Sequence, residues 1–114
     1  MRKVDTNGII TTVVGNGSCY DSGDGGPATN AGINPESIAV DAAGNLYVGE
    51  GNNHRVRKVD TSGIITTAMG NGIITYSLDG TLAVPGGVNE PSDFAFDDLG
   101  NFYVADSVLS LIHI

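Results

Sequence analysis

Short apolar runs separated by glycine-rich turns recur along the whole chain, and several of these runs are apolar on both faces. In the run 9–14, Ile9 and Val13 would point to one face of a strand. Ile10 and Val14 would point to the other face. A sheet packed between two other sheets has this pattern, whereas a sheet with one solvated face alternates apolar and polar positions. We therefore predict eight strands, at 2–5, 9–14, 37–41, 46–50, 55–60, 64–69, 93–97 and 102–106.

The predicted strands belong to a repeat. Residues 57–72 match residues 2–17 at 13 of 16 positions, with an offset of 55 residues. Residues 91–106 repeat residues 35–50 more loosely, with an offset of 56 residues. Repetition at this period predicts equivalent β units that pack on one another. The connections at 16–34 and 71–90 are glycine-rich, and a one-residue change in length costs little there.

The repeated residues resemble an NHL repeat. The likeness lies in 44–48 (GNLYV), the acid Glu50, 53–60 (NHRVRKVD) and 63–67 (GIITT). The segment 21–28 (DSGDGGPA) resembles a loop of long bacterial NHL arrays. This resemblance covers residues 1–107 and implies an all-β fold, a partial β-propeller whose blades are four-stranded antiparallel sheets.

The resemblance divides the chain into about two blade equivalents: a half blade, a full blade and a half blade. Residues 1–15 are the end of one blade, 35–70 a complete blade and 91–107 the start of the next. Closed propellers have four to eight blades, so we expect a fragment. Residues 108–114 depart from the repeat. The last six read as a translated sequencing adapter, which favours a non-native tail on a metagenomic sequence over a divergent natural terminus.

The charge balance narrows the range of partners. The chain of 114 residues carries 5 Lys and Arg against 13 Asp and Glu, a formal net charge of −8. An acidic surface disfavours binding to nucleic acid or to anionic membranes, and no apolar run is long enough for membrane insertion. Cys19 is the only cysteine, which excludes an internal disulfide and leaves the compartment unknown. The bacterial resemblance favours a secreted or cell-envelope protein.

The two long connections contain the candidate binding residues. Tyr20, Asp21, Asp24 and Tyr76 lie there, where they could contact a ligand or pack against the blade edge. Asp21 and Asp24 are weak candidates for a metal site, because the loop lacks the number of oxygen ligands that Ca²⁺ needs. We favour a solvated, turn-rich loop, with no metal and no cofactor.

The strand ends contain the candidate ion pairs. Glu50 and Asp106 occupy equivalent strand ends, and Arg55 and Arg57 begin the strand that follows Glu50. We expect structural pairing between the acids and the arginines rather than acid–base chemistry. His54 is interpreted as structural, so the sequence offers no Ser–His–acid arrangement and no catalytic residue.

The favoured function is therefore a binding scaffold, an arc of an NHL propeller that presents loops to a protein or carbohydrate ligand. The alternative is an arc of a propeller lyase or lactonase-like enzyme whose active site lies mostly in other blades. A structural spacer in a repeat array is a third reading. The remaining blades of a parent propeller, or self-association, are the expected partners of the exposed blade faces.

Overall fold

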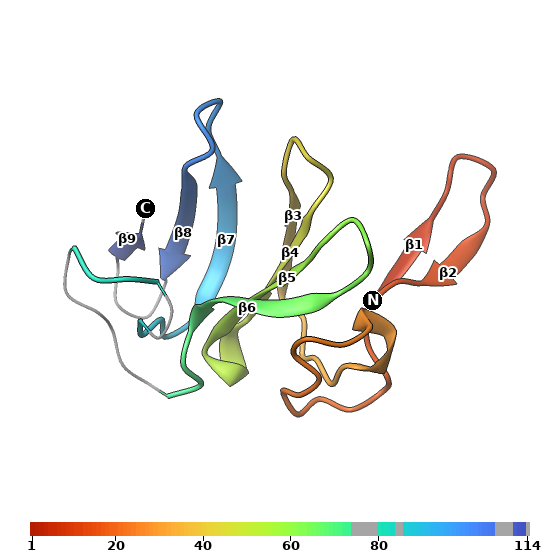
Figure 1. Ribbon diagram of the computed structural model, residues 1–114, viewed down its shortest axis with the longest axis horizontal. Coiled ribbons are helices and arrows are strands. Elements are labelled where there is room, and N and C mark those ends of the chain that lie inside the picture. Colours follow the sequence, from red (N-terminus) through yellow and green to blue (C-terminus); the bar gives the residue numbers. More distant parts are fainter. Residues whose placement is uncertain (74–79, 84–85, 107–110, 114) are drawn as a thin grey trace.

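The computed structural model describes residues 1–73, 80–83, 86–106 and 111–113, and forms three antiparallel sheets that stand in a row (Figure 1). The candidate residue Tyr76 lies outside the described residues. The first sheet pairs β1 with β2, the second has the order β3-β4-β5-β6, and the third has the order β7-β8-β9. The strands are β1 (Arg2–Val4), β2 (Ile10–Thr12), β3 (Ser37–Val40), β4 (Leu46–Glu50), β5 (Arg55–Val59), β6 (Ile65–Gly70), β7 (Pro91–Phe96), β8 (Phe102–Asp106) and β9 (Leu111–His113).

The predicted all-β partial propeller is confirmed. The second sheet is a complete four-stranded unit, and strands pair antiparallel with their neighbours in chain order. Two short 3₁₀ turns, η1 (Ala28–Asn30) and η2 (Gly51–Asn53), interrupt the connections. Among the described residues, no helix has the length and apolar character needed to cross a membrane.

All eight predicted strands form, with small differences at their ends, and a ninth strand was not predicted. β7 begins at Pro91, two residues before the predicted start, because Pro91 pairs with Asp106 across a bulge. β9 lies beside β8, with Leu111 opposite Asp106 as Arg55 is opposite Glu50 in the second sheet. The backbone of β9 thus takes the position of a third blade strand, although its sequence departs from the repeat.

One turn design closes the hairpins. Asp60 accepts hydrogen bonds on Oδ1 from the N–H groups of Ser62 and Ile64, and Gly63 follows with φ of 83°. Asp5, Asp41 and Asp97 form the same contacts with the residues two and four positions further on. The left-handed position explains the glycine, because a β-carbon there is strained. The predicted turns are therefore confirmed.

The apolar core lies on both faces of the second sheet. One cluster packs the connection that follows β2, through Val14 and Ala31, against Val48 and Ile65 of the second sheet. The other joins the second and third sheets, and in it the rings of Tyr47, Phe94, Phe96 and Phe102 lie with centroids 4.8–5.3 Å apart. The second sheet buries residues on both faces, as a sheet between two neighbours does. In the run 9–14, by contrast, Ile9 and Ile10 are exposed, so the two-sided burial expected there is not seen.

Candidate functional site

The connection 16–34 lies beside the second sheet, at the end of the molecule opposite the β3–β4 and β7–β8 turns (Figure 1). Its backbone bonds to the start of β6. The Gly25 N–H donates to Ile65 O at 2.7 Å, and the Ala28 N–H donates to Gly63 O at 2.8 Å. Pro27 forms a bridge with Ile64. The loop is therefore fixed to the blade by backbone hydrogen bonds as well as by side chains.

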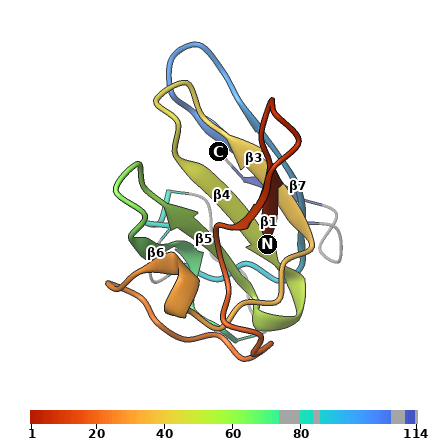
Figure 2. The same cartoon turned by 90° about the vertical axis from the view of Figure 1, so that its right-hand side faces the viewer.

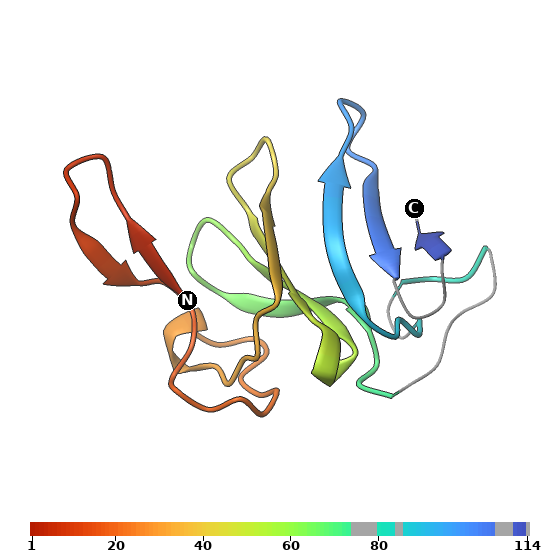
Figure 3. The same ribbon diagram turned by 180° about the vertical axis from the view of Figure 1, so that it is seen from behind.

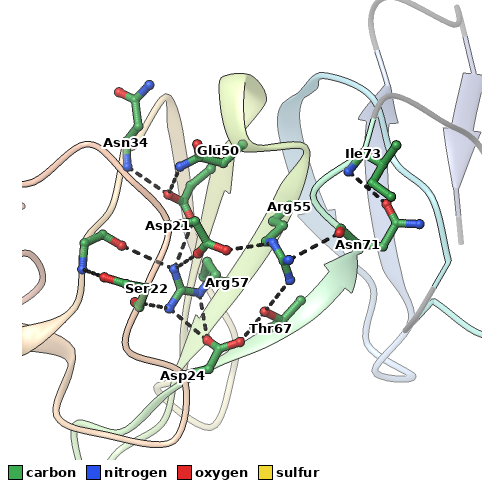
Figure 4. A network of polar contacts seen from close by, with 12 residues as sticks. Asp21, Ser22, Asp24, Asn34, Glu50, Arg55, Arg57, Thr67, Asn71 and Ile73 are labelled. Carbon is green, nitrogen blue, oxygen red and sulfur yellow. Dashed lines mark hydrogen bonds and ion pairs between the residues drawn. The ribbon is translucent and has the colours of Figure 1, made fainter.

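Arg57 is the centre of the site. It lies in the middle of β5 with its side chain fully buried (0 % exposed), and it contacts three carboxylates (Figure 4). Its Nη1 lies 3.3 Å from Glu50 Oε2 and also bonds to Asp21 Oδ1. Its Nε donates to Asp24 Oδ1 at 2.9 Å. A buried guanidinium is stable only when its donors are satisfied, and these acids satisfy most of them.

Backbone carbonyls of the loop complete the shell of Arg57. Nη2 donates to Ser22 O at 2.9 Å, and Nη1 donates to Gly32 O at 3.3 Å. The guanidinium thus binds two separate points of the loop backbone, at Ser22 and at Gly32. Its planar fork of five N–H donors is suited to this task, which a lysine could not perform.

Arg55 extends the network toward the outer strand. Its Nε lies 2.7 Å from Asp21 Oδ2, an ion pair whose angle does not fit a hydrogen bond. Its Nη2 donates to Asn71 O at 3.2 Å. The Thr67 hydroxyl donates to Asp24 Oδ2 at 2.5 Å. Both carboxylate oxygens of each loop aspartate therefore have a partner, and Asp21 contacts both arginines.

The strand-end acids hold the chain segment that enters their own sheet. Glu50 Oε1 accepts the Asn34 N–H at 2.8 Å. Asp106, at the equivalent place, accepts the N–H groups of Asn89 and Glu90 at 2.9 and 3.1 Å. Both acids are fully buried. The repeat therefore reproduces a structural task, in which a carboxylate satisfies backbone donors at the start of a blade.

The predicted residues are only partly brought together. The structure places Arg57 against Glu50, but Arg55 lies against Asp21, and Asp106 lies in the third sheet. The binding of Asp21 and Asp24 to the arginines was not foreseen, because 31 or more residues separate them from Arg55 and Arg57. The only available signal was the pairing of an acidic loop with a basic strand inside one repeat.

Tyr20 is the most exposed of the candidate loop residues that the structure describes. Its side chain is 79 % exposed, although both of its neighbours are held. The carbonyl of Cys19 accepts a hydrogen bond from Asn53 Nδ2 at 3.3 Å, and Asp21 binds the arginines. The Tyr20 N–H donates to Ser18 Oγ at 3.3 Å. The loop therefore presents an aromatic ring from a fixed backbone.

Within the described residues, no group of three or more His, Cys, Asp or Glu side chains is placed to hold a metal ion. The carboxylates of Asp21 and Asp24 face guanidinium groups, which compete with a cation for the same oxygens. His54 directs Nδ1 to Asn89 O, 2.6 Å away, and so connects the second sheet to the connection that precedes β7. These contacts are structural.

Shifted pKa values in the described part of the chain occur in the hairpins. The pKa of Asp41 and of Asp97 is lowered, first because an asparagine side chain four residues further on donates to each carboxylate. Burial raises the pKa of Tyr47, and the hydrogen bond to Asp97 raises that of Tyr103. These shifts result from hydrogen bonds in the turns and from burial between sheets, and none of the four groups lies in the connection 16–34.

The repeat, the blade topology and the buried arginine cluster define an NHL-type β-propeller segment. The family of teneurin NHL domains matches residues 17–78, more than half of the chain, and the chain belongs to this family. Two curated relatives are each 37 % identical over 92 residues, namely teneurin-4 of Mus musculus and teneurin-3 of Danio rerio. The matched part is 75 % of this chain and 3 % of each relative.

Two solved structures from Bacteroides thetaiotaomicron share the fold. One, a protein of unknown function, superposes with a TM-score of 0.78 at 23 % identity, over 97 % of this chain and 28 % of that one. The other is described as a candidate phosphatase, with a TM-score of 0.67 at 25 % identity and the same coverage. The chain therefore spans less than a third of these proteins.

Proposed function

We propose that this NHL segment is part of an interaction module that presents the connection 16–34 to a protein or carbohydrate ligand. The observation that carries the proposal is the accessible Tyr20 ring on a backbone fixed by the buried Arg57. A rigid aromatic side chain loses little conformational entropy on binding and offers both apolar area and a hydroxyl group. Aromatic residues of this kind dominate binding energies at protein interfaces.

The geometry of the loop supports binding more than catalysis. Its acids are used to hold the loop, and its histidine neighbour, His54, contacts a backbone carbonyl. One structure with the same fold is described as a candidate phosphatase. The purified chain should therefore also be assayed with p-nitrophenyl phosphate. Hydrolysis would favour an enzyme, and hydrolysis that survives Tyr20→Ala would contradict a role in binding alone.

The proposal is tested by comparing the binding of the unmodified chain and of Tyr20→Ala on a glycan array and on a protein array. Loss of a central aromatic contact is expected to weaken binding by about tenfold or more, because such residues contribute about 2 kcal/mol. Leu99→Ala is the matched control. Leu99 is also highly exposed, but it lies in the β7–β8 hairpin turn at the other end of the molecule (Figure 1). Equal binding by the unmodified chain and Tyr20→Ala would contradict the proposal.

A further inference from the structure

Two apolar side chains of β3 are exposed, whereas their counterparts in the third sheet are half-buried. Ile38 is 57 % and Val40 is 62 % exposed. They lie opposite Val48 and Leu46, and so on the face of the second sheet that belongs to the first apolar cluster. Figure 2 shows β1 in front of β3 on this side of the molecule. Phe94 and Phe96 occupy the same repeat positions in the third sheet, and both pack against the second sheet. Ile38 and Val40 thus occupy positions that, in the third sheet, form one side of an interface between sheets.

The surface that meets such side chains is known from the contact between the second and third sheets, where β7 runs beside β3 (Figure 3). Tyr47 lies 4.9 Å from the ring centroids of Phe96 and Phe102. Gly49 has no side chain, and a β-carbon there would lie 2.7 Å from Phe94 Cζ. The complementary surface is therefore a tyrosine flanked by very small residues.

The outer face of the third sheet repeats this surface. Ala95, Tyr103 and Ala105 correspond to Ala39, Tyr47 and Gly49 at the offset of 56 residues. Ala95 is exposed, and Tyr103 and Ala105 are half-buried. One end of the molecule thus presents branched apolar side chains, and the other end presents the tyrosine face that accepts them.

β1 offers a strand edge for the same contact. In the described part of the chain β1 pairs only with β2, and the odd-numbered residues Met1 and Asp5 form the hydrogen bonds to that side. Because antiparallel bonding alternates, the N–H groups of Arg2 and Val4 point to the other edge. A hollow of about 470 Å³ adjoins this edge, at the place that corresponds to the β4–β5 corner of the second sheet.

We propose that two copies of the chain bind head to tail, with β1 of one copy pairing with β8 of its partner so that β7, β8, β1 and β2 form one four-stranded blade. The β4–β5 pair supplies the register. Val48 faces Arg57, Tyr47 faces Lys58 and Leu46 faces Val59. Transferred through the repeat, Val104 faces Arg2, Tyr103 faces Lys3 and Phe102 faces Val4.

The charges agree with this register. Arg2 corresponds to Arg57, and Asp106 corresponds to Glu50. Arg2 of one copy would therefore lie beside Asp106 of the partner as Arg57 lies 3.3 Å from Glu50. The same docking places the partner's Tyr103 face over Ile38 and Val40. Since each copy contributes two blade equivalents, closed rings of four to eight blades contain two to four copies.

β9 competes with this contact, because it pairs with the edge of β8 that β1 of a second copy would use. The first test is therefore assembly of the full chain and of a chain that ends at Asp106, measured by light scattering during size-exclusion chromatography. The shorter chain is expected to assemble at about tenfold lower concentration, since it loses a three-residue competitor. If both chains remain monomers of about 11 to 12 kDa at 100 μM, the proposal is overturned.

A disulfide tests the register directly. In a Cys19→Ser background, Lys3→Cys with Tyr103→Cys places the two thiols opposite each other in a non-hydrogen-bonded pair, where β-carbons are close enough for a disulfide. Mild oxidation is expected to yield covalent oligomers. The control pair Lys3→Cys with Val104→Cys is shifted by one residue, so its side chains point to opposite faces. Equal cross-linking of the two pairs, or none in assembled protein, would refute the register.

A proline separates docking from folding. Val4→Pro removes an N–H that faces the open edge, and edge strands tolerate proline in that orientation. Val4→Thr keeps both the N–H and the branched β-carbon. We expect Val4→Pro to weaken assembly about tenfold or more relative to Val4→Thr, with both variants retaining the circular dichroism spectrum of the parent. Unchanged assembly of a folded Val4→Pro chain would contradict β1 pairing.

Discussion

At the scale of single residues, Arg57 determines how the loop and the blade fit together. It satisfies a buried acid from its own sheet, Glu50, and two acids from the connection that precedes the sheet, Asp21 and Asp24. The burial of Glu50 makes its pairing the most costly to break, because Asp24 is 45 % exposed and can be hydrated. The arginine therefore joins local stability to the presentation of Tyr20.

Replacing Arg57 is expected to destabilise the chain strongly. Arg57→Met keeps much of the side-chain volume but leaves Glu50 as a buried charge without its cation, which costs about 3–5 kcal/mol. Lys58→Met removes one positive charge from the opposite face of the same strand and is expected to cost less than about 0.5 kcal/mol. Urea unfolding followed by circular dichroism gives both values. A loss below about 1 kcal/mol for Arg57→Met would show that the cluster is not a stabilising centre.

The lowered pKa values of the hairpin aspartates predict that the folded chain loses stability at acidic pH. The folded pKa of Asp41 and Asp97 lies below the usual value of 3.8, first because of the side chains of Asn45 and Asn101. Their contribution is therefore complete above that value and is lost as the pH falls through the lowered pKa. Asp97→Asn with Asp41→Asn should flatten the fall in thermal midpoint below pH 4. An identical acid limb in all chains would contradict this assignment.

At the scale of elements, the sequence was sufficient for the strands and turns but insufficient for the loop. The hairpins follow from local chemistry, since an aspartate and a glycine three residues later close each one. The contacts of Asp21 and Asp24 with Arg57 span 33 to 36 residues and depend on how the connection crosses the sheet. Periodicity says nothing about that path. β9 was missed for a related reason, because backbone pairing with β8 does not need the repeat sequence.

The turn design can be tested at Gly63. Its φ is 83°, and a β-carbon there would contact nothing within 4 Å, so substitution isolates the backbone strain. Gly63→Ala is expected to destabilise the chain by about 1 kcal/mol, because L-residues are disfavoured in the left-handed region. Gly63→Asn should cost less, since asparagine tolerates that conformation. Chemical denaturation provides the comparison, and a stabilising Gly63→Ala would reject the strained-turn explanation.

At the scale of the whole molecule, stability depends on contacts between sheets. One apolar cluster lies between the second sheet and the segment that follows β2, and the other lies between the second and third sheets. A blade that lacks a neighbour exposes the residues that would have been covered. At about 25 cal/mol per Å², several hundred Å² of lost apolar contact corresponds to about 10 kcal/mol, which is comparable with the stability of a whole domain.

The exposed residues of β3 allow a test of whether an uncovered sheet face drives self-association. Ile38→Thr with Val40→Thr changes side chains that are more than half exposed, and threonine suits a strand as well as they do. The free energy of unfolding of the dispersed chain should therefore change by less than about 0.5 kcal/mol per site. Self-association and binding of an apolar dye should both fall, because the polar side chains remove the reason for covering this face. Leu99→Thr removes an exposed apolar side chain from a hairpin turn and should change neither property. If the double variant instead loses several kcal/mol of stability without any change in association, these side chains serve the core of the isolated chain, and the face toward β1 and β2 does not drive association.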